Sequence, residues 1–296
     1  MTQSQPTSRP GAGLHASVGS ATGAGAEAGA AERSPLRQRA AVAVAPRPAV
    51  RTEDLSVGFG DATVLQDVTV AFAPNAVNAL IGPTGCGKST FLRSINRMND
   101  QVRGYWRRGS VRVGDDEVEA PGVDPLDLRR RVGMVFQRPN PFPMSIEDNV
   151  VAGVRAHRLA PRRDLRGIAE HHLRQVGLWA AVAGRLDDSP FRLSGGQQQL
   201  LCLARALAVG PEVLLLDEPT SSLDPISTEM VEDLLVQLSA DLTMVMVTHN
   251  LGQARRISST TTFFYNGRMV ESGPTGQVFE SPNEPETVSY VSGRIG

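Results

Sequence analysis

Eight consecutive residues, 82–89, have the composition of a phosphate-binding loop. They form the sequence GPTGCGKS, which matches the pattern GxxxxGK[ST] at every position. Glycines let backbone N–H groups converge on phosphate oxygens, and the start of a following helix adds the positive end of its dipole. The pattern therefore predicts that the chain binds ATP through this loop. The candidate ATP-binding residues here are Gly82, Pro83, Thr84, Gly85, Cys86, Gly87, Lys88, Ser89 and Thr90.

Two side chains of this loop can act on the nucleotide directly. Lys88 can reach the β- and γ-phosphates, and the Ser89 hydroxyl can bind Mg²⁺. We therefore expect ATP and Mg²⁺ as cofactors. Cys86 could in principle be oxidised and block ATP, but a small residue that merely fits the loop is the simpler interpretation.

Two adjacent carboxylates, Asp217 and Glu218, follow the apolar run 213–216. Four consecutive apolar residues are typical of a parallel strand that is covered on both faces. The carboxyl ends of such strands form the ligand-binding edge of α/β sheets. We expect Asp217 to hold Mg²⁺, directly or through water, and Glu218 to polarise the attacking water as a general base. Two solvated acids at a strand end are the alternative, which the phosphate loop disfavours.

A second anion site is predicted where the run Ser194, Gly195, Gly196 and Gln197 precedes a long helical segment. Ser194 suits an N-cap, and the glycines leave the backbone N–H groups accessible. One chain cannot easily direct two helix N-termini at one triphosphate, whereas two chains packed head to tail can. The run therefore predicts a homodimer that closes each ATP between Lys88 of one copy and Ser194 of the other. A capped surface helix is the alternative.

The elements that must position these motifs alternate along the chain. Because predicted strands alternate with predicted helices, we expect a mostly parallel α/β sheet. A hairpin is expected at 262–270, with its turn at Asn266-Gly267. The other predicted strands are 63–72, 77–81, 132–136, 213–216 and 243–247; the predicted helices are 88–98, 195–209, 226–238 and, broken at Pro161, the region 146–185.

Composition limits the classes of function. The 296 residues include 30 Lys and Arg against 31 Asp and Glu, so no nucleic-acid partner is expected. Two cysteines are too few for a disulfide framework, and no apolar run approaches the roughly 18 residues of a membrane helix. Residues 1–48 are rich in Ala, Gly, Ser, Pro and Arg and lack aromatic residues. We expect a disordered tail there, with a transit peptide as the alternative.

The order of these motifs resembles the nucleotide-binding subunit of ABC transporters, from about residue 51 to residue 296. The resemblance implies that Gln137 contacts Mg²⁺ and the attacking water, and that it signals to membrane subunits. It implies that His249 contacts the γ-phosphate and that Asp224 communicates across the dimer. It places Phe59 where the family stacks an aromatic ring, more often tyrosine, on adenine. Taken alone, Gln137, Asp224 and Phe59 would each be interpreted as structural.

Five stretches, 135–146, 195–199, 223–228, 263–265 and 290–294, resemble more closely the ATPase of phosphate-specific importers. Prolines at 139, 141 and 143 stiffen the segment after Gln137, and a stiff loop with an apolar tip suits a socket for the coupling helix of a membrane partner. A rigid surface loop without a partner is the alternative. Leu200 departs from the arginine that is usual at its position in these ATPases, which makes one charged contact near the predicted helix 195–209 doubtful, though not the hydrolysis.

The resemblance implies a P-loop NTPase core of the ABC type with a mostly parallel sheet, an antiparallel β subdomain and an inserted helical subdomain. It implies an ATPase domain at 49–296, with a nucleotide-binding core at about 49–137 and 197–296 and a helical subdomain at about 138–196. The implied function is a motor that hydrolyses ATP to energise uptake of inorganic phosphate. Its partners would be a second copy, two integral-membrane permeases and, indirectly, a phosphate-binding protein.

The implied location is the cytoplasmic face of the cell membrane, as a peripheral subunit. Three other functions stay open at this point: an importer ATPase for another small anion or an amino acid, a soluble ABC ATPase that remodels DNA or the ribosome, and an ATP-dependent regulatory module. The balanced charge and the lack of a long heptad insertion or a second nucleotide domain count against the soluble ATPase.

Overall fold

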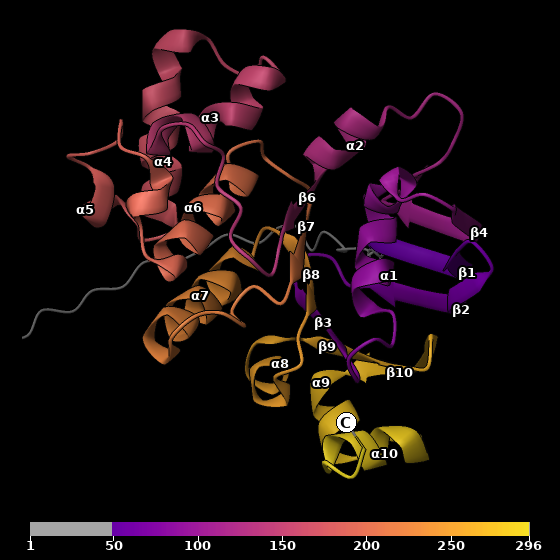
Figure 1. Ribbon diagram of the computed structural model, residues 1–296. Helices are drawn as coiled ribbons and strands as arrows, with labels where there is room; N and C mark the ends of the chain where they lie inside the picture. The colour runs from indigo at the N-terminus through magenta and orange to yellow at the C-terminus, as the bar shows by residue number, and fades with distance from the viewer. Residues whose placement is uncertain (1–48, 296) are drawn as a thin grey trace, which may run out of the picture. The chain divides into compact units, whose positions relative to one another are not determined.

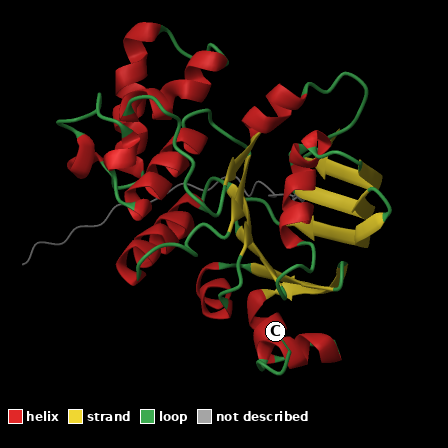
Figure 2. Cartoon of the chain, in the orientation of Figure 1, coloured by secondary structure: helices red, strands yellow, loops and turns green. Residues whose placement is uncertain are grey.

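The computed structural model describes residues 49–295. The predicted disordered tail, 1–48, lies outside the described residues. Figure 1 shows that the helices lie on both sides of a central sheet and that a second sheet lies across helix α1 (Lys88–Ile95) from it; Figure 2 shows the same view by secondary structure. No helix within the described part of the chain is long and apolar enough to cross a membrane.

The central sheet has six strands in the order β10-β9-β3-β8-β7-β6. Its first five strands in chain order pair in parallel, and only β10 is antiparallel to its neighbour β9. This confirms the predicted mostly parallel α/β sheet. The strands are β3 (Val77–Ile81), β6 (Val132–Val135), β7 (Val213–Asp217), β8 (Thr243–Val247), β9 (Thr260–Tyr265) and β10 (Arg268–Pro274).

The hairpin between β9 and β10 turns at the predicted dipeptide. Asn266 has φ 48° and Gly267 has φ 77°, which are the positive values that a two-residue type I′ turn needs at both positions. A Cβ atom at Gly267 would lie 2.5 Å from the carbonyl oxygen of Val64. The turn therefore needs glycine for its backbone conformation and also for its close approach to β2 (Ala62–Phe72).

The second sheet is antiparallel, with strand order β2-β1-β4-β5. Of its strands, only β2 was predicted from the apolar pattern, as the strand 63–72. In β1 the alternation is interrupted at Asp54, which has φ 49°, and the pairing of β1 with both neighbours shifts register nearby. Such bulges hide the period of two that identifies a strand. The strands are β1 (Val50–Phe59), β2 (Ala62–Phe72), β4 (Tyr105–Val113) and β5 (Asp116–Glu117).

Helices cover both faces of the central sheet. The predicted helical region broken at Pro161 is present as separate helices on either side of that residue, whereas α2 and the three helices after β8 were not predicted. The helices are α1 (Lys88–Ile95), η1 (Met98–Gln101), α2 (Pro125–Arg131), α3 (Ile146–Ala156), η2 (Arg162–Asp164), α4 (Leu165–Gln175), α5 (Trp179–Val182), η3 (Pro190–Arg192), α6 (Gly195–Leu207), α7 (Pro225–Leu238), α8 (Leu251–Ile257), α9 (Thr275–Glu280) and α10 (Pro285–Val291).

Helix α1 lies between the two sheets (Figure 1). Phe91, Leu92 and Ile95 are fully buried there, in one hydrophobic cluster with residues of both sheets. The helix ends at Ile95, three residues before the predicted end, because Arg97 has φ 60° and a 3₁₀ turn follows. Burial on both sides fixes the position of the helix that follows the phosphate loop.

The opposite face of the central sheet packs on the helical layer. Leu214 and Leu216 of β7 belong to a cluster with residues of α3, α4, α6 and α7, whereas Leu215 faces the cluster around α1. This alternation is the period of two of a strand that is covered on both faces. Helix α6 contacts both α3 and α4. It begins at Gly195 and so continues past residue 196, where we expected the helical subdomain to end.

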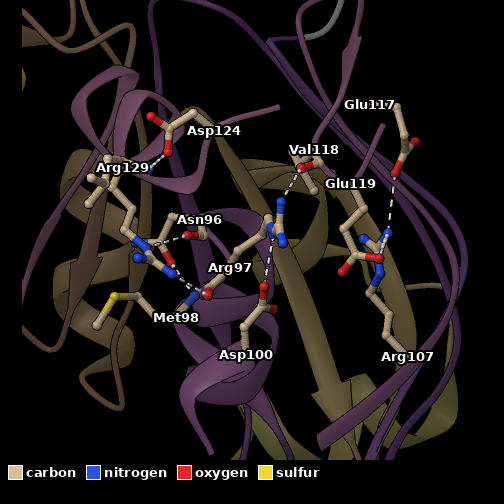
Figure 3. Close-up of polar contacts among 11 residues, drawn as sticks. Asn96, Arg97, Met98, Asp100, Arg107, Glu117, Val118, Glu119, Asp124 and Arg129 are labelled. Carbon is tan, nitrogen blue, oxygen red and sulfur yellow. Dashed lines mark hydrogen bonds and ion pairs between the residues drawn. The ribbon is translucent and has the colours of Figure 1, made fainter. Parts of the chain in front are cut away.

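An arginine cluster ties α2 to the C-terminal end of α1 (Figure 3). Arg129 donates to the carbonyl oxygens of Asn96 and Arg97 at 3.3 and 2.8 Å. The side chain of Arg97 pairs with Asp100 at 2.9 Å and donates to the carbonyl of Val118. A cation is favourable at the C-terminus of a helix, where the last carbonyl groups have no partner within the helix. Since α2 leads directly into β6, this contact connects α1 to that strand.

We predict that Arg129→Gln lowers the free energy of unfolding by about 1–3 kcal/mol, because two hydrogen bonds from a charged donor are lost. Urea unfolding followed by circular dichroism measures this. The matched control is Arg130→Gln, which breaks an exposed pair with Asp127 and should change stability by about 0.5 kcal/mol or less. Equal effects of the two variants would contradict a specific role for Arg129.

Candidate nucleotide site

The phosphate loop joins the buried strand β3 to α1 in a conformation that depends on its glycines. Gly82 has φ 144° and Gly87 has φ 104°, both in the region that favours glycine. A Cβ atom at Gly82 would lie 2.1 Å from the carbonyl oxygen of Phe264, and one at Gly87 would lie 2.5 Å from Leu65. Gly87 is also the N-cap of α1 and leaves its first N–H groups without a side-chain partner.

Lys88 is held inside this loop by the loop's own backbone. Only 6% of the residue is exposed, and its Nζ donates to the carbonyl oxygens of Gly82 and Pro83 at 2.7 and 2.8 Å. An ammonium group at the N-terminus of a helix concentrates positive charge at one point. The arrangement favours an anion such as a phosphate group.

Ser89 and Asp217 place two oxygen ligands side by side next to the loop. The Ser89 hydroxyl donates to Asp217 Oδ1 at 2.7 Å, and Arg93 Nη2 lies 3.2 Å from Asp217 Oδ2. Asp217 is buried at the carboxyl end of β7, where the guanidinium of Arg93 compensates its charge. Arg93 was not predicted from the sequence, although it lies one helical turn after Ser89 and so shares its face of α1.

Glu218 is the point at which three loops meet. Its Oε2 accepts a hydrogen bond from Gln137 Nε2 at 3.0 Å and lies 3.0 Å from His249 Nδ1. These residues follow β6, β7 and β8, which are adjacent and parallel, so their side chains emerge at one edge of the sheet. The backbone of Glu218 has φ 48°, an uncommon value for a residue with a side chain, and it is held by a hydrogen bond from its N–H to the Val247 carbonyl.

A cavity of about 500 Å³ lies between the phosphate loop and Glu218. It brings together most of the predicted ATP-binding residues and all three predicted catalytic residues, and it adds Val64, for which the sequence offered no signal. Of the other predicted residues of the loop and the metal site, Gly82, Pro83, Cys86 and Asp217 do not line it. Its lining consists of Val64, Thr84, Gly85, Gly87, Lys88, Ser89, Thr90, Gln137, Glu218 and His249.

Phe59 does not line this cavity. It ends β1, and its ring centroid lies 5.9 Å from that of Tyr105 on β4. The stacking of Phe59 on adenine therefore stays a prediction.

The run at 194–197 forms a capped helix start away from the cavity. Ser194 Oγ accepts from the N–H of Gln197 at 3.3 Å, and Gln197 Oε1 accepts from the N–H of Ser194 at 3.1 Å, a capping box at the start of α6. Ser194 and Gly195 are exposed, and neither lines the cavity. A Cβ atom at Gly196 would lie 2.8 Å from Ser227 Oγ, so the helix start lies against the beginning of α7.

Asp224 caps α7. Its Oδ1 accepts from the N–H of Ser227 at 3.0 Å, and its Oδ2 accepts from the Ser227 hydroxyl at 2.5 Å. These hydrogen bonds, the hydroxyl first, lower the pKa of Asp224 below its ordinary value. The residue is exposed, and it has at least this structural role.

The proline-rich segment after Gln137 is fastened to α6 and α3. Arg205 donates to the backbone oxygen and to Oδ1 of Asn140 at 3.0 and 2.7 Å, and its guanidinium lies 4.2 Å from the centroid of the Phe142 ring. The fully buried Asn149 accepts from the N–H of Phe142 at 2.7 Å. The tip presents Phe142 and Met144, which are 41% and 40% exposed. A rigid segment thus carries an exposed apolar tip.

Leu200 is buried in the hydrophobic cluster of the helical layer. Because its position on α6 is buried, an apolar side chain packs there without leaving a charge unpaired.

Both cysteines are buried. Burial raises the pKa of the Cys86 thiol above its ordinary value, although Lys88 beside it acts in the opposite direction. Burial likewise raises the pKa of Cys202. The thiolate is the reactive form, so both effects of burial disfavour oxidation and alkylation.

We predict that neither cysteine of the folded protein reacts with iodoacetamide at pH 7.5 within an hour, and that both react in 6 M urea. Mass spectrometry of the alkylated protein measures this. Because burial raises both pKa values, any slow reaction should increase with pH only above the range of an ordinary thiol. Fast labelling of Cys86 in the folded protein would restore the possibility of a redox role.

Comparison with known proteins agrees with this geometry. Residues 65–221 match the family model for the ABC transporter, just over half of the chain. The chain is 57% identical over 267 residues to the phosphate import ATP-binding proteins PstB 2 of Mycobacterium tuberculosis and Mycobacterium bovis, which covers 90% of this chain and 96% of each relative. It is 59% identical over 243 residues to phosphate import ATP-binding protein PstB of Mycobacterium intracellulare, which covers 82% and 85%. The chain therefore belongs to the ABC transporter family, as an ATPase subunit.

Proposed function

We propose that this chain is the subunit that hydrolyses ATP to energise an importer of inorganic phosphate. Its similarity to phosphate import ATP-binding proteins over nine-tenths of its length supports the substrate. The observation that carries the chemistry is the contact of Gln137 and His249 with the same oxygen of Glu218, both at 3.0 Å, at the edge of the cavity that also holds Lys88.

ATP binds with its phosphates in the loop at 82–89. Backbone N–H groups at the start of α1 face the phosphate oxygens, and Lys88 contributes the positive charge that the β- and γ-phosphates need. Thr84, Gly85 and Thr90 line the same cavity. The adenine lies beyond the loop, with Phe59 as the expected stacking partner.

Ser89, Asp217 and Gln137 are the residues that would hold Mg²⁺. Their oxygen atoms are the ligands that this ion prefers, and the 2.7 Å contact of Ser89 with Asp217 puts two of these residues beside the phosphates. Bound Mg²⁺ supplies positive charge that neutralises the β- and γ-phosphates. The buried carboxylate of Asp217 is suited to binding the ion. Arg93 contacts only its Oδ2, so its Oδ1 is available to the Ser89 hydroxyl or to a cation.

Glu218 accepts the proton of the attacking water as the water adds to the γ-phosphorus atom and the bond to ADP breaks. General-base catalysis of this kind contributes about 10²–10⁴-fold. Gln137 and His249 hold the carboxylate from two sides and so direct one oxygen toward the water. When His249 donates from Nδ1 to Glu218, its Nε2 stays available for the γ-phosphate.

A second copy of the chain completes the site. Ser194 and Gly195 lie exposed at the start of α6 and outside the cavity of their own chain. In a head-to-tail dimer they close on the ATP of the partner, because a helix N-terminus is a ready anion site. Asp224, at the start of the helix that Gly196 touches, then lies where it can communicate between the two sites.

The rigid segment 138–145 is the docking surface for the membrane partners. Its apolar tip, Phe142 and Met144, suits a short helix of a permease, and its contacts with α6 link that surface to the second anion site. We place the dimer at the cytoplasmic face of the cell membrane, on two permeases that receive phosphate from a binding protein. Phosphate itself does not contact this chain during transport.

We predict that Glu218→Gln retains ATP affinity but hydrolyses ATP at least about 100-fold more slowly, because the amide cannot accept the proton. Calorimetry measures binding, and release of phosphate measures turnover. In gel filtration with ATP the variant should elute as a dimer. The matched control is Glu212→Gln, at the other end of β7, which should hydrolyse ATP at the normal rate. A normal rate for Glu218→Gln would remove that residue from the mechanism.

Uptake of labelled phosphate tests the transport function. Cells that lack the gene should regain uptake with the normal chain and not with Glu218→Gln, and sulfate uptake should not change. If the normal chain restores no phosphate uptake while the purified protein hydrolyses ATP, phosphate as substrate is wrong and the ATPase chemistry stands. Restoration of sulfate or amino-acid uptake instead would identify the other importer classes.

A further inference from the structure

We propose that Gln253 is a positioning residue for hydrolysis: it joins the loop that carries Glu218 to the helix that follows His249, and the buried carboxylate of Glu232 orients it. The inference rests on the proposed function, because it concerns how Glu218 and His249 are held. Neither Gln253 nor Glu232 lines the cavity of the phosphate loop.

One amide group connects three segments of the chain. Gln253 lies in the first turn of α8 and is 1% exposed. Its Nε2 donates to Thr220 Oγ1 at 2.8 Å and to Glu232 Oε1 at 3.1 Å. Thr220 is two residues after Glu218 and Gln253 is four residues after His249, so the bridge links the loops on which both catalytic candidates lie.

Glu232 determines which way the amide points. An amide nitrogen has two hydrogens, and both are used here, whereas a carboxylate can only accept. The amide oxygen therefore cannot turn toward Glu232 without repulsion, and the nitrogen is kept facing Thr220. Glu232 is 6% exposed, so its charge must be compensated. Arg256, one turn further along α8, does this with Nε and Nη2 at 2.8–3.1 Å.

The loop around His249 is tied to the same turn of α8. Asn250 caps the helix by accepting from the N–H of Gln253 at 2.9 Å, and its own N–H donates to Thr248 Oγ1 at 3.0 Å. The His249 side chain is itself 59% exposed, so packing alone does not fix it relative to Glu218. Their relative position depends on how the backbones of the two loops are fixed, which the bridge through Gln253 does.

The consequence is a change in kcat without a change in KM. Loss of the bridge would loosen the contact between Glu218 and His249 while the phosphate loop keeps its own contacts through Lys88. We expect Gln253→Leu and Thr220→Val each to lower kcat by about five- to tenfold, which corresponds to a typical coupling between residues in contact. KM for ATP should stay within about twofold.

Steady-state ATPase assays of the full chain test this with a double-mutant cycle. The double variant Thr220→Val with Gln253→Leu should be no slower than the slower single variant, because both remove one interaction. Thr220→Ser keeps the hydroxyl and should retain the normal kcat. The matched control on the same helix is Arg255→Gln, which breaks an exposed pair with Glu280 and should not change kcat.

Three results would overturn the inference: normal kcat in Gln253→Leu and Thr220→Val, equal losses in Thr220→Ser and Thr220→Val, or losses that multiply in the double variant. If Gln253→Leu does not fold, the comparison of Thr220→Val with Thr220→Ser decides alone, since both changes are small. Glu218→Gln is assayed in parallel. If it hydrolyses ATP normally, the proposed function fails; if it is inactive while Thr220→Val is normal, only the present inference fails.

Discussion

The burial of α1 between the two sheets is the constraint on which the nucleotide site depends. The loop before it contains three glycines with positive φ, and such a conformation persists only when both of its ends are held. Strand β3 holds one end inside the central sheet. At the other end Phe91, Leu92 and Ile95 are fully buried, and each contributes about 1.5–3 kcal/mol. The antiparallel sheet is thus a structural part of the site, although the cavity lining includes only Val64 from it.

The parallel pairing of β6, β7 and β8 supplies the second constraint. The register pairs Val135 with Leu216 and Asp217 with Val247, so the three strands end at nearly the same level along the strand direction. Gln137, Glu218 and His249 therefore meet without any of them being close in the sequence. The hydrogen bonds of Gln253 to Thr220 and Glu232 then connect two of these loops.

Helix α6 extends from the run at 194–197, which is proposed to contact the nucleotide of a second copy, to the segment proposed to bind membrane partners. Its N-terminus carries the Ser194 capping box, its Gln199 donates to the carbonyl oxygen of Phe136 just before Gln137, and Arg205 in its last turn donates to Asn140 in the segment after Gln137. One helix therefore carries both the proposed second anion site and the contacts to the segment with the apolar tip. Leu200 and Leu207 of this single helix are packed in the hydrophobic cluster of the helical layer.

Several features followed from the sequence alone because they depend on neighbouring residues. Local residue spacing and the backbone freedom of glycine identify the phosphate loop and the Asn266-Gly267 turn. Short apolar runs identify strands β3 and β8, and an apolar run followed by two acids identifies Asp217 and Glu218. The roles of Gln137 and His249 came from family resemblance, since a lone glutamine or histidine after a strand carries no specific signal.

Only the tertiary structure decided how distant segments meet. Strands β1 and β4 pair across more than forty residues of sequence, and their bulges hide the alternation that would have identified them. The contacts of Glu218 with Gln137, of Asp217 with Arg93 and of Gln253 with Glu232 join residues that no local pattern relates. Their side chains are directed by strand register and helix packing, and these are set by the burial of apolar surface over the whole domain rather than by any short stretch of sequence.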